Sequence, residues 1–437
     1  MKDRPSSPVP SGRLSRFLEL GAAASQMALG GAAEKMRRLA QKAEAGLPSV
    51  LLTADNARIL AMRLSHLRGA AMKVGQMLSL EGDSVLPKEF AQALDILRSS
   101  AHRMPEAQLR SVLVAELGKD WQTRFEAFDF LPLASASIGQ VHAARTKDGR
   151  DVVLKIQYPG VASSIDSDVD NLRSLLAFSR LLPGDLDLDA LADEVKKELR
   201  REVDYTQELA SLLRYRELLR SQPGVWIPDG LPEHSTARVL CLERASGQQL
   251  LGWAETAGQA ERNRVAEVLV RVVLQEVFGM GYCQTDPNPA NYLFDAERGR
   301  VVLLDFGAAR PVPAGITELY RAATRALIER DRALLAEVYR TMGTILGDDT
   351  PAAQLLVSMG FEVAEIFDDA PYDFAASTLA PRMRDRGMAL IPHRKDLRPP
   401  APEFVFFQRK ITGTYLLLRQ LRAVLNLRPI LAEASLG

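Results

Sequence analysis

The chain has 437 residues, 47% of them hydrophobic, which is enough for one large bilobal domain or two ordinary domains, each with its own core. Its 55 basic and 55 acidic residues give a formal net charge of zero, which argues against the broad basic surface of a nucleic-acid-binding protein. Two cysteines, Cys241 and Cys283, are too few for a disulfide framework or a thiolate metal site, so a reducing compartment is expected.

Residues 1–42 contain a polar segment followed by a helical pattern. Residues 1–12 are polar and rich in turn formers, and we expect a disordered leader. Residues 13–42 form a helical pattern with small residues on one face and basic residues at the ends, which is typical either of a membrane-surface or helix-pairing segment or of a helix packed on its own protein. The uncharged stretch 20–33 is shorter than the roughly 20 residues of a membrane-spanning helix, so none is expected.

The following elements alternate between helical and strand periodicity. Residues 56–80 repeat apolar side chains at steps of four and three, which predicts an amphipathic helix carrying Lys73 and Gln76. Later segments predict strands at 125–133, 139–146, 151–158 and 237–243, a charged helix at 189–221, and a mainly helical region after 259 that contains a strand pair at 292–295 and 301–305. This α+β order is the plan of a protein kinase, although the pattern alone would fit other α+β folds.

Lys155 lies in the middle of the apolar strand Val152–Ile156. Burying an ammonium group is costly unless an anion meets it, and a nucleotide phosphate together with a helix carboxylate is the kinase solution. Because strands alternate faces, a lysine on the solvent side of an edge strand is the alternative interpretation.

Two further motifs match the catalytic centre of a kinase. Asp305-Phe306-Gly307 follows an apolar strand, where a metal-binding carboxylate is expected. Upstream, Asp286 and Asn291 are five positions apart, which is the spacing of the kinase catalytic loop. An ordinary proline-rich turn could explain that loop in isolation, but the order of all three motifs favours a kinase.

The predicted helix 189–221 must supply the carboxylate that meets Lys155. The candidates are Glu198, Glu202, Asp204 and Glu208. Glu202 and Glu208 differ by six positions, about 120° around one helix at ~100° per residue, so they should face two different partners. Besides Lys155, Lys73 is the other lysine in an unusual setting, so it is the candidate for the second partner.

The loop that should cover the phosphates contains alanine and serine where a protein kinase has glycine. It runs Ala134-Ser135-Ala136-Ser137-Ile138-Gly139-Gln140. Alanine does not readily adopt the positive-φ conformations of glycine, so we expect this loop to approach the phosphates differently. The residues predict nucleotide binding, whereas ordinary phosphoryl transfer to a protein is not expected.

Together these motifs resemble those of the UbiB/ADCK group of atypical kinases, which is associated with ubiquinone biosynthesis. The group's Lys-x-Gly-Gln motif matches Lys73-Val74-Gly75-Gln76, its alanine-rich loop matches 134–137, and its Glu-x-Asp motif matches Glu202-Val203-Asp204. The similarity extends from about residue 13 to about 425 and includes Phe407-Gln408-Arg409-Lys410. The catalytic loop is more similar to that of the mitochondrial-type branch of the group than to that of many bacterial members.

The resemblance implies a kinase-like bilobal fold with a small β-rich N-lobe, a helical C-lobe and a helical N-terminal extension. We expect the leader at 1–12, the extension at 13–124, the N-lobe at 125–246 and the C-lobe at 247–437. In this picture the extension lies across the site where a protein substrate would bind. That arrangement leaves ATPase or small-molecule kinase chemistry with ATP/ADP and Mg²⁺.

The site residues that follow from the motifs and the resemblance fall into four groups. Asp286, Lys155 and Glu208 are the expected catalytic residues, and Asn291 and Asp305 the expected magnesium ligands. The expected nucleotide-binding residues, besides Lys155, are Leu133, Ala134, Ser135, Ala136, Ser137, Glu243, Arg244, Ala245 and Ser246. The expected regulatory residues are Lys73, Gly75, Gln76, Glu202 and Asp204, with Lys73 paired to Glu202.

The expected function is that of a Mg-ATP-dependent atypical kinase or ATPase supporting ubiquinone biosynthesis at a membrane surface. A non-catalytic, nucleotide-gated scaffold for biosynthetic enzymes and a small-molecule kinase of related fold are the alternatives. Candidate partners are a lipid or quinone precursor, a membrane surface and the enzymes of ubiquinone biosynthesis, without nucleic acid. The expected location is cytoplasmic and peripheral to the inner membrane in a bacterium, or the matrix side in mitochondria.

Overall fold

The computed structural model describes residues 103–136, 138–179, 188–345, 347, 350–398 and 400–435. These residues form two compact units. The first contains the described chain up to Leu209 together with Gly230–Arg244, and the second contains Ala210–Asp229 and the described chain from Ala245 onward. The predicted helices at 13–42 and 56–80 lie outside the described residues.

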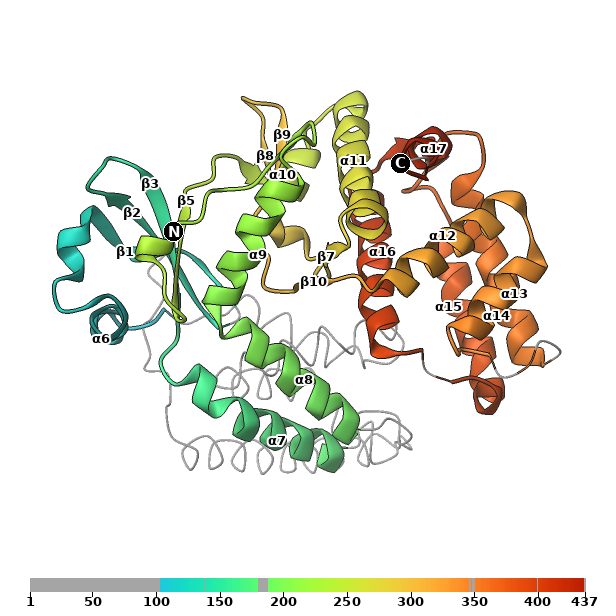
Figure 1. Ribbon diagram of the computed structural model, residues 1–437, viewed down its shortest axis with the longest axis horizontal. Helices are drawn as coiled ribbons and strands as arrows, with labels where there is room; N and C mark the ends of the chain where they lie inside the picture. The colour runs from blue at the N-terminus through green and yellow to red at the C-terminus, as the bar shows by residue number, and fades with distance from the viewer. Residues whose placement is uncertain are drawn as a thin grey trace, which may run out of the picture. The chain divides into compact units, whose positions relative to one another are not determined.

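A four-stranded antiparallel sheet forms the centre of the first unit (Figure 1). Its order is β1 (Phe125–Ser135), β2 (Gly139–Thr146), β3 (Asp151–Gln157) and β5 (Val239–Glu243). Val152, Leu154 and Ile156 of β3 are completely buried, and because side chains alternate along a strand, Lys155 points to the other face. All four predicted strands of this region are confirmed.

Helix α6 (Glu106–Leu117) shares the apolar core of this sheet. Leu109, Val112, Leu113 and Leu117 of α6 are buried in one cluster with Trp121 and the core residues of β3. Each such side chain contributes roughly 1.5–3 kcal/mol when fully buried. Glu116 of the same helix accepts a hydrogen bond from Thr236 Oγ1 at 2.6 Å and pairs with Arg238.

The charged segment after the sheet forms two helices, so the expectation of a single helix over 189–221 was wrong. Helix α8 (Leu188–Glu202) ends before Asp204, and α9 (Tyr205–Leu218) begins after it. Asp204 Oδ1 accepts from the backbone N–H of Thr206 at 3.0 Å, while the N–H of Tyr205 donates to Ala237 O at 3.0 Å. An aspartate whose side chain accepts from one of the first N–H groups favours the start of a new helix. The 120° angle between Glu202 and Glu208 therefore does not apply.

A further helix was not predicted. Helix α7 (Val161–Ser179) lies beside α8 (Figure 1), and Lys196 Nζ of α8 contacts Asp170 Oδ1 of α7 at 2.6 Å. Neither helix contains one of the expected catalytic residues.

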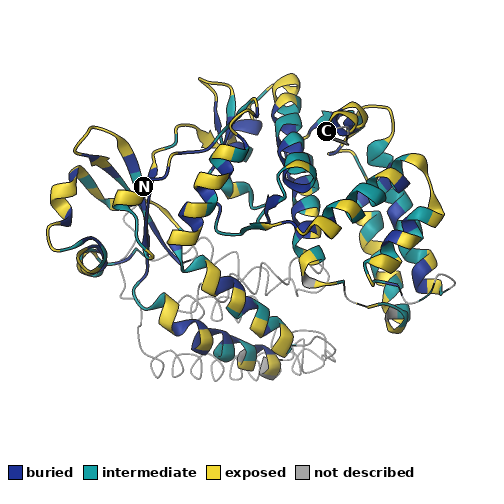
Figure 2. Cartoon of the chain, in the orientation of Figure 1, coloured by how far each residue is buried: buried dark blue, intermediate teal, exposed yellow. Residues whose placement is uncertain are grey.

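The second unit is mainly helical, as expected for the chain after residue 259. Its longer helices are α11 (Gln259–Leu274), α12 (Ala314–Glu329), α13 (Arg332–Thr341), α14 (Pro351–Val363), α15 (Leu379–Leu390), α16 (Pro402–Gln420) and α17 (Leu427–Ser435). A π-helical turn, η4 (Gln275–Gly279), continues α11. Figure 2 shows the buried stripe of α11, to which Val265, Ala266 and Leu269 belong.

Short strands position the loops of this unit. The expected strand pair is confirmed as β8 (Tyr292–Asp295) and β9 (Arg300–Leu303), which pair with β6 (Gln248–Gln249) and β4 (Val225–Trp226) in the order β4-β9-β8-β6. A second ladder joins β7 (Tyr282–Gln284) to β10 (Ala309–Pro311), and β11 (Tyr372–Asp373) pairs with β12 (Val424–Leu425). Strands of two or three residues have too short a pattern to be predicted.

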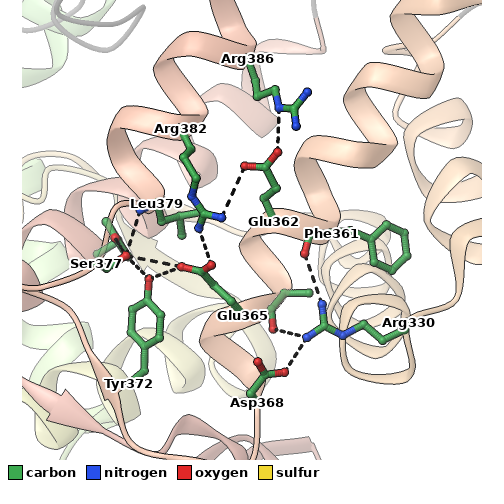
Figure 3. A network of polar contacts seen from close by, with 12 residues as sticks. Arg330, Phe361, Glu362, Glu365, Asp368, Tyr372, Ser377, Leu379, Arg382 and Arg386 are labelled. Carbon is green, nitrogen blue, oxygen red and sulfur yellow. Dashed lines mark hydrogen bonds and ion pairs between the residues drawn. The ribbon is translucent and has the colours of Figure 1, made fainter.

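A network of ion pairs ties α15 to α14 and the turn after it (Figure 3). Arg386 Nε lies 2.8 Å from Glu362 Oε1, Arg382 contacts Glu365, and Tyr372 Oη donates to Glu365 at 2.8 Å. The arginines are half-exposed, so each ion pair alone contributes little to stability. Any stabilisation comes from the several pairs acting together as a network. No helix in the described part of the chain is both long and apolar enough to cross a bilayer.

Candidate active site

Lys155 and Glu208 form a bidentate ion pair in the first unit. Lys155 Nζ lies 2.9 Å from Oε1 and 3.0 Å from Oε2 of Glu208, and 5.1 Å from the ring centroid of Tyr205. The Glu208 side chain is only 5% exposed and that of Lys155 17%. Removing either partner would leave a largely desolvated charge without its counter-ion. Of the four candidate carboxylates, the structure therefore joins Glu208 to Lys155.

The other candidates lie elsewhere on α8 or at its end. Glu198 is buried and contacts Arg201 at 3.3 Å on its own helix. Glu202 is the last residue of α8, and Asp204 caps α9. Lys73, Gly75 and Gln76 are outside the described residues, so the pairing of Lys73 with Glu202 stays a prediction.

The alanine-rich loop begins on the sheet itself. Leu133, Ala134 and Ser135 end β1, and the N–H of Ala136 donates to Gly139 O at 2.8 Å, while Ser137 is outside the described residues. A Cβ at Gly139 would lie 2.3 Å from Ile156 O. The loop therefore returns into β2 at a position that only glycine can occupy.

In the expected nucleotide-binding segment 243–246, backbone and side-chain hydrogen bonds hold Arg244 and Ser246. Arg244 N donates to Asp151 O at 2.9 Å, and Ser246 Oγ donates to the buried carboxylate of Asp295 at 3.0 Å. Burial alone would raise the pKa of Asp295, but the hydrogen bonds from Ser246 and Arg298 outweigh it and lower the pKa. Because the Ser246 hydroxyl is engaged, the backbone is the part of this residue suited to contact an adenine.

Gln284 connects the catalytic loop to the Asp-Phe-Gly segment. Its Oε1 accepts from the N–H of Asp286 at 2.8 Å, and its Nε2 donates to the backbone carbonyl of Asp305 at 3.2 Å. The Gln284 side chain is buried at the end of β7. One amide therefore fixes the backbone of both predicted acidic residues, a role that sequence reasoning did not assign to it.

The carboxylate of Asp286 has two side-chain partners. Arg409 Nη2 of α16 lies 3.0 Å from its Oδ1, and Asn291 Nδ2 donates to its Oδ2 at 3.4 Å. The Arg409 side chain is only 7% exposed. Sequence reasoning noted the segment containing Arg409 but gave that residue no function, because 123 positions separate the pair.

Asp305 and Asn291 lie at adjacent ends of β9 and β8. The N–H of Leu304 donates to Asn291 O at 3.0 Å, which ties the two segments together, and the N–H of Gly307 donates to Asp305 Oδ1 at 3.0 Å. Phe306 is buried against Tyr215, with ring centroids 4.8 Å apart. The packed phenylalanine anchors the loop that carries Asp305.

The donor set of this region fits magnesium. One carboxylate and one amide oxygen are hard ligands, and Mg²⁺ in nucleotide sites takes one or two such groups and completes its shell with phosphate and water. Asn291 directs its amide nitrogen to Asp286, so its amide oxygen is the atom that remains to face a cation. The described residues contain no group of three His, Cys, Asp or Glu able to hold a metal by themselves.

A comparison with protein families decides the classification. The model of the ABC1 atypical kinase-like domain matches residues 96–339, which is more than half of the chain. The chain belongs to the ABC1 atypical kinase-like family. The match contains Lys155, Glu208, Asp286, Asn291 and Asp305.

Curated relatives extend the similarity beyond the ABC1 domain. The atypical kinase COQ8, mitochondrial, of Saccharomyces cerevisiae is 35% identical over 98% of this chain and 86% of its own length. The atypical kinase COQ8B, mitochondrial, of Rattus norvegicus is 36% identical over 97% of this chain and 81% of its length.

A solved structure agrees in fold. Rv3197 of Mycobacterium tuberculosis, solved with erythromycin, has a TM-score of 0.64 and 25% identity over 85% of this chain and 93% of that one. The expected kinase-like α+β fold and the atypical-kinase family are thereby confirmed. ABC1 membership also confirms the expected enzyme class, that of ATP-dependent atypical kinases.

Proposed function

We propose that this ABC1-family chain binds Mg-ATP and acts as an ATPase, or as a kinase of a small molecule, in support of ubiquinone biosynthesis at a membrane surface. The observation that carries the proposal is the linkage of Asp286, Asn291 and Asp305 through Gln284 and Arg409. Gln284 holds the backbone of both acidic residues, and Asn291 and Arg409 hold the carboxylate of Asp286. Phosphoryl chemistry depends mainly on such positioning.

Each residue has a role in this proposal. Lys155, oriented by Glu208, would contact the α- and β-phosphates, and Asp305 and Asn291 would hold magnesium. Bound magnesium would neutralise charge on the phosphate oxygens. Asp286 would orient the attacking water or hydroxyl group and accept its proton, while Arg409 keeps that carboxylate in place.

The adenine and the outer phosphates would be held mainly by backbone. Residues 243–246 would line the adenine, with the Ser246 hydroxyl occupied by Asp295. Residues 133–137 would cover the phosphates. Lys73, Gly75, Gln76, Glu202 and Asp204 remain the proposed regulators of access to the site.

The short segment after Asp305 is an argument for a small molecule as the phosphoryl acceptor. In a protein kinase an activation loop follows Asp-Phe-Gly and is ordered by phosphorylation. Here β10 begins at Ala309 and pairs with β7, and α12 begins at Ala314. So short a connection gives a peptide substrate little to bind, which favours water or a small hydroxyl compound as acceptor.

The support for ubiquinone biosynthesis comes from the relatives and from the resemblance to the UbiB/ADCK group. The yeast and rat relatives are named as mitochondrial COQ8-type atypical kinases. A membrane surface, a quinone precursor and the enzymes of the same biosynthesis are the partners that we propose on this basis. The location proposed is peripheral to the membrane that makes ubiquinone.

Thermal denaturation with nucleotide tests the metal role. Asp305→Asn removes the charged magnesium ligand, so the magnesium-dependent increase in melting temperature with ATP should disappear, while the melting temperature without ligand stays close to that of the wild type. Asp385→Asn, at an exposed position of α15, is the control and should respond like the wild type. An undiminished magnesium-dependent shift in Asp305→Asn would contradict the proposal.

A further inference from the structure

Glu276 and Lys410 form a buried ion pair beneath the catalytic loop. Lys410 Nζ of α16 lies 2.9 Å from Glu276 Oε2 and 3.2 Å from Oε1, and the side chains are 4% and 1% exposed. Burial opposes the charge of Lys410, but the Glu276 carboxylate outweighs it and raises the pKa of the ammonium group. A pair this deeply buried is weak evidence of stability, because desolvation offsets most of the attraction.

Glu276 also contacts residues of the strand that leads into the catalytic loop. Its Oε1 accepts hydrogen bonds from Tyr215 Oη at 3.0 Å and from the backbone N–H of Gln284 at 3.4 Å, and Cys283 Sγ lies 3.8 Å from its Oε2. Burial, followed by the charge of Glu276, raises the pKa of both Tyr215 and Cys283. The Glu276 carboxylate is therefore surrounded by neutral hydrogen-bond donors and the Lys410 ammonium group, next to β7, the strand that leads into the catalytic loop.

A change in helix type places Glu276 there. Residues Gln275–Gly279 form the π-helical turn η4, in which Glu276 is almost completely buried. Such turns interrupt the regular hydrogen-bond ladder and are frequent at functional sites.

We propose that Glu276 and Lys410 are positioning residues that hold β7 in the register required for the chemistry of Asp286. The proposal rests on the proposed function. Glu276 fixes the backbone of Gln284, and Gln284 in turn fixes the Asp286 N–H and the Asp305 carbonyl, so the buried pair acts on both acidic residues without touching substrate.

A neutral double variant separates positioning from folding. Removing one partner leaves an uncompensated buried charge that can prevent folding, whereas Glu276→Gln with Lys410→Met keeps the volume and removes both charges together. The control is Arg271→Met with Glu433→Gln, which deletes a partly exposed pair, 2.7 Å apart, between α11 and α17, together with the contact of Arg271 to Glu267.

Two measurements are made on folded, full-length protein. In the Glu276/Lys410 double variant, hydrogen exchange of the amides at 282–286 should become at least about tenfold faster, because their opening no longer breaks a buried pair. ATP turnover (kcat) should fall at least about tenfold while KM for ATP changes by less than about threefold, since only positioning for the chemical step is lost. The control should match the wild type in both.

A purely structural role predicts a different pattern. The proposal would be overturned if the double variant exchanged its amides at 282–286 as slowly as the wild type, or if its kcat per folded molecule were unchanged. A KM for ATP that rises in proportion to the loss of kcat would also overturn it. Absence of ATP turnover in the wild type would instead refute the proposed function. The exchange measurement still decides in that case whether the pair holds the catalytic loop.

Discussion

Partners distant in sequence fix individual side chains of the active site. Glu208 is 53 positions from Lys155, and Arg409 is 123 positions from Asp286. In each pair at least one side chain is almost completely buried, so loss of one partner would leave a charge that little water can reach. The direction in which these candidate site residues point therefore depends on tertiary contacts of the fold.

A buried histidine near the alanine-rich loop should make stability depend on pH. His142 is completely buried, its Nδ1 lies 3.0 Å from Asp129 O, and burial lowers its pKa. Because the folded chain takes up this proton at a lower pH than the unfolded chain does, the free energy of unfolding should decrease as the pH is lowered. The decrease is at most about 1.4 kcal/mol between pH 7.5 and 5.5.

Urea unfolding of the wild type and His142→Gln at the two pH values measures this effect. The variant lacks the titrating group and should lose less stability on acidification, by that same amount. Equal losses in the two proteins would show that His142 does not contribute.

Several residues of the proposed site were identifiable from sequence because they occur at short, motif-like spacings. Asp286 and Asn291 are one loop apart, Asp305 ends an apolar strand, and Lys155 interrupts another. Gln284, Glu276 and Lys410 could not be found in this way, since their significance lies in contacts between β7, η4 and α16. The four candidate carboxylates of the predicted helix 189–221 likewise left the partner of Lys155 open until the resemblance was considered.

At the scale of elements, α16 packs closely on the catalytic loop. A Cβ added to Gly413 would lie 2.1 Å from Pro287 Cγ, so no larger residue fits unless the helix or the loop moves. Gly413→Ala should reduce the free energy of unfolding by about 1–3 kcal/mol, as overpacking does. It should also reduce ATP turnover, because Pro287 follows Asp286 directly.

Gly387→Ala provides the matched control within α15. No atom lies within 4 Å of a Cβ at Gly387, so alanine there should stabilise the protein, by up to about 1 kcal/mol, through helix propensity. Urea denaturation and steady-state ATP hydrolysis check both variants. A Gly413→Ala protein as stable and active as the wild type would show that the close packing is unimportant.

The boundaries of elements were less predictable than their type. Alternation of apolar residues identified the strands of the first unit, whereas the break between α8 and α9 contains neither glycine nor proline. Asp204 was the available signal, because aspartate is a preferred first residue before a helix. Helix α7 was not predicted, because its amphipathic sequence contains no chemical motif.

At the scale of the whole molecule, a helix near the end of the described chain contacts two residues of the candidate active site and its surroundings. Helix α16 lies beyond residues 96–339 matched by the ABC1 model, yet it supplies Arg409 to Asp286 and Lys410 to Glu276. The yeast relative aligns over 98% of this chain, which includes α16. The kinase-like class of the fold was predictable from the order of strands, helices and motifs, but the contribution of α16 was not.

Quinone profiling of a deletion strain tests the central claim, that Asp286 acts in an ATP-dependent reaction needed for ubiquinone. The strain lacks the gene for this chain and is rescued by the wild type or by Asp286→Asn, at equal protein levels. The wild type should restore ubiquinone, and Asp286→Asn, which keeps the size of the side chain but not its charge, should not. Full restoration by Asp286→Asn would contradict the enzymatic account and favour a nucleotide-gated scaffold.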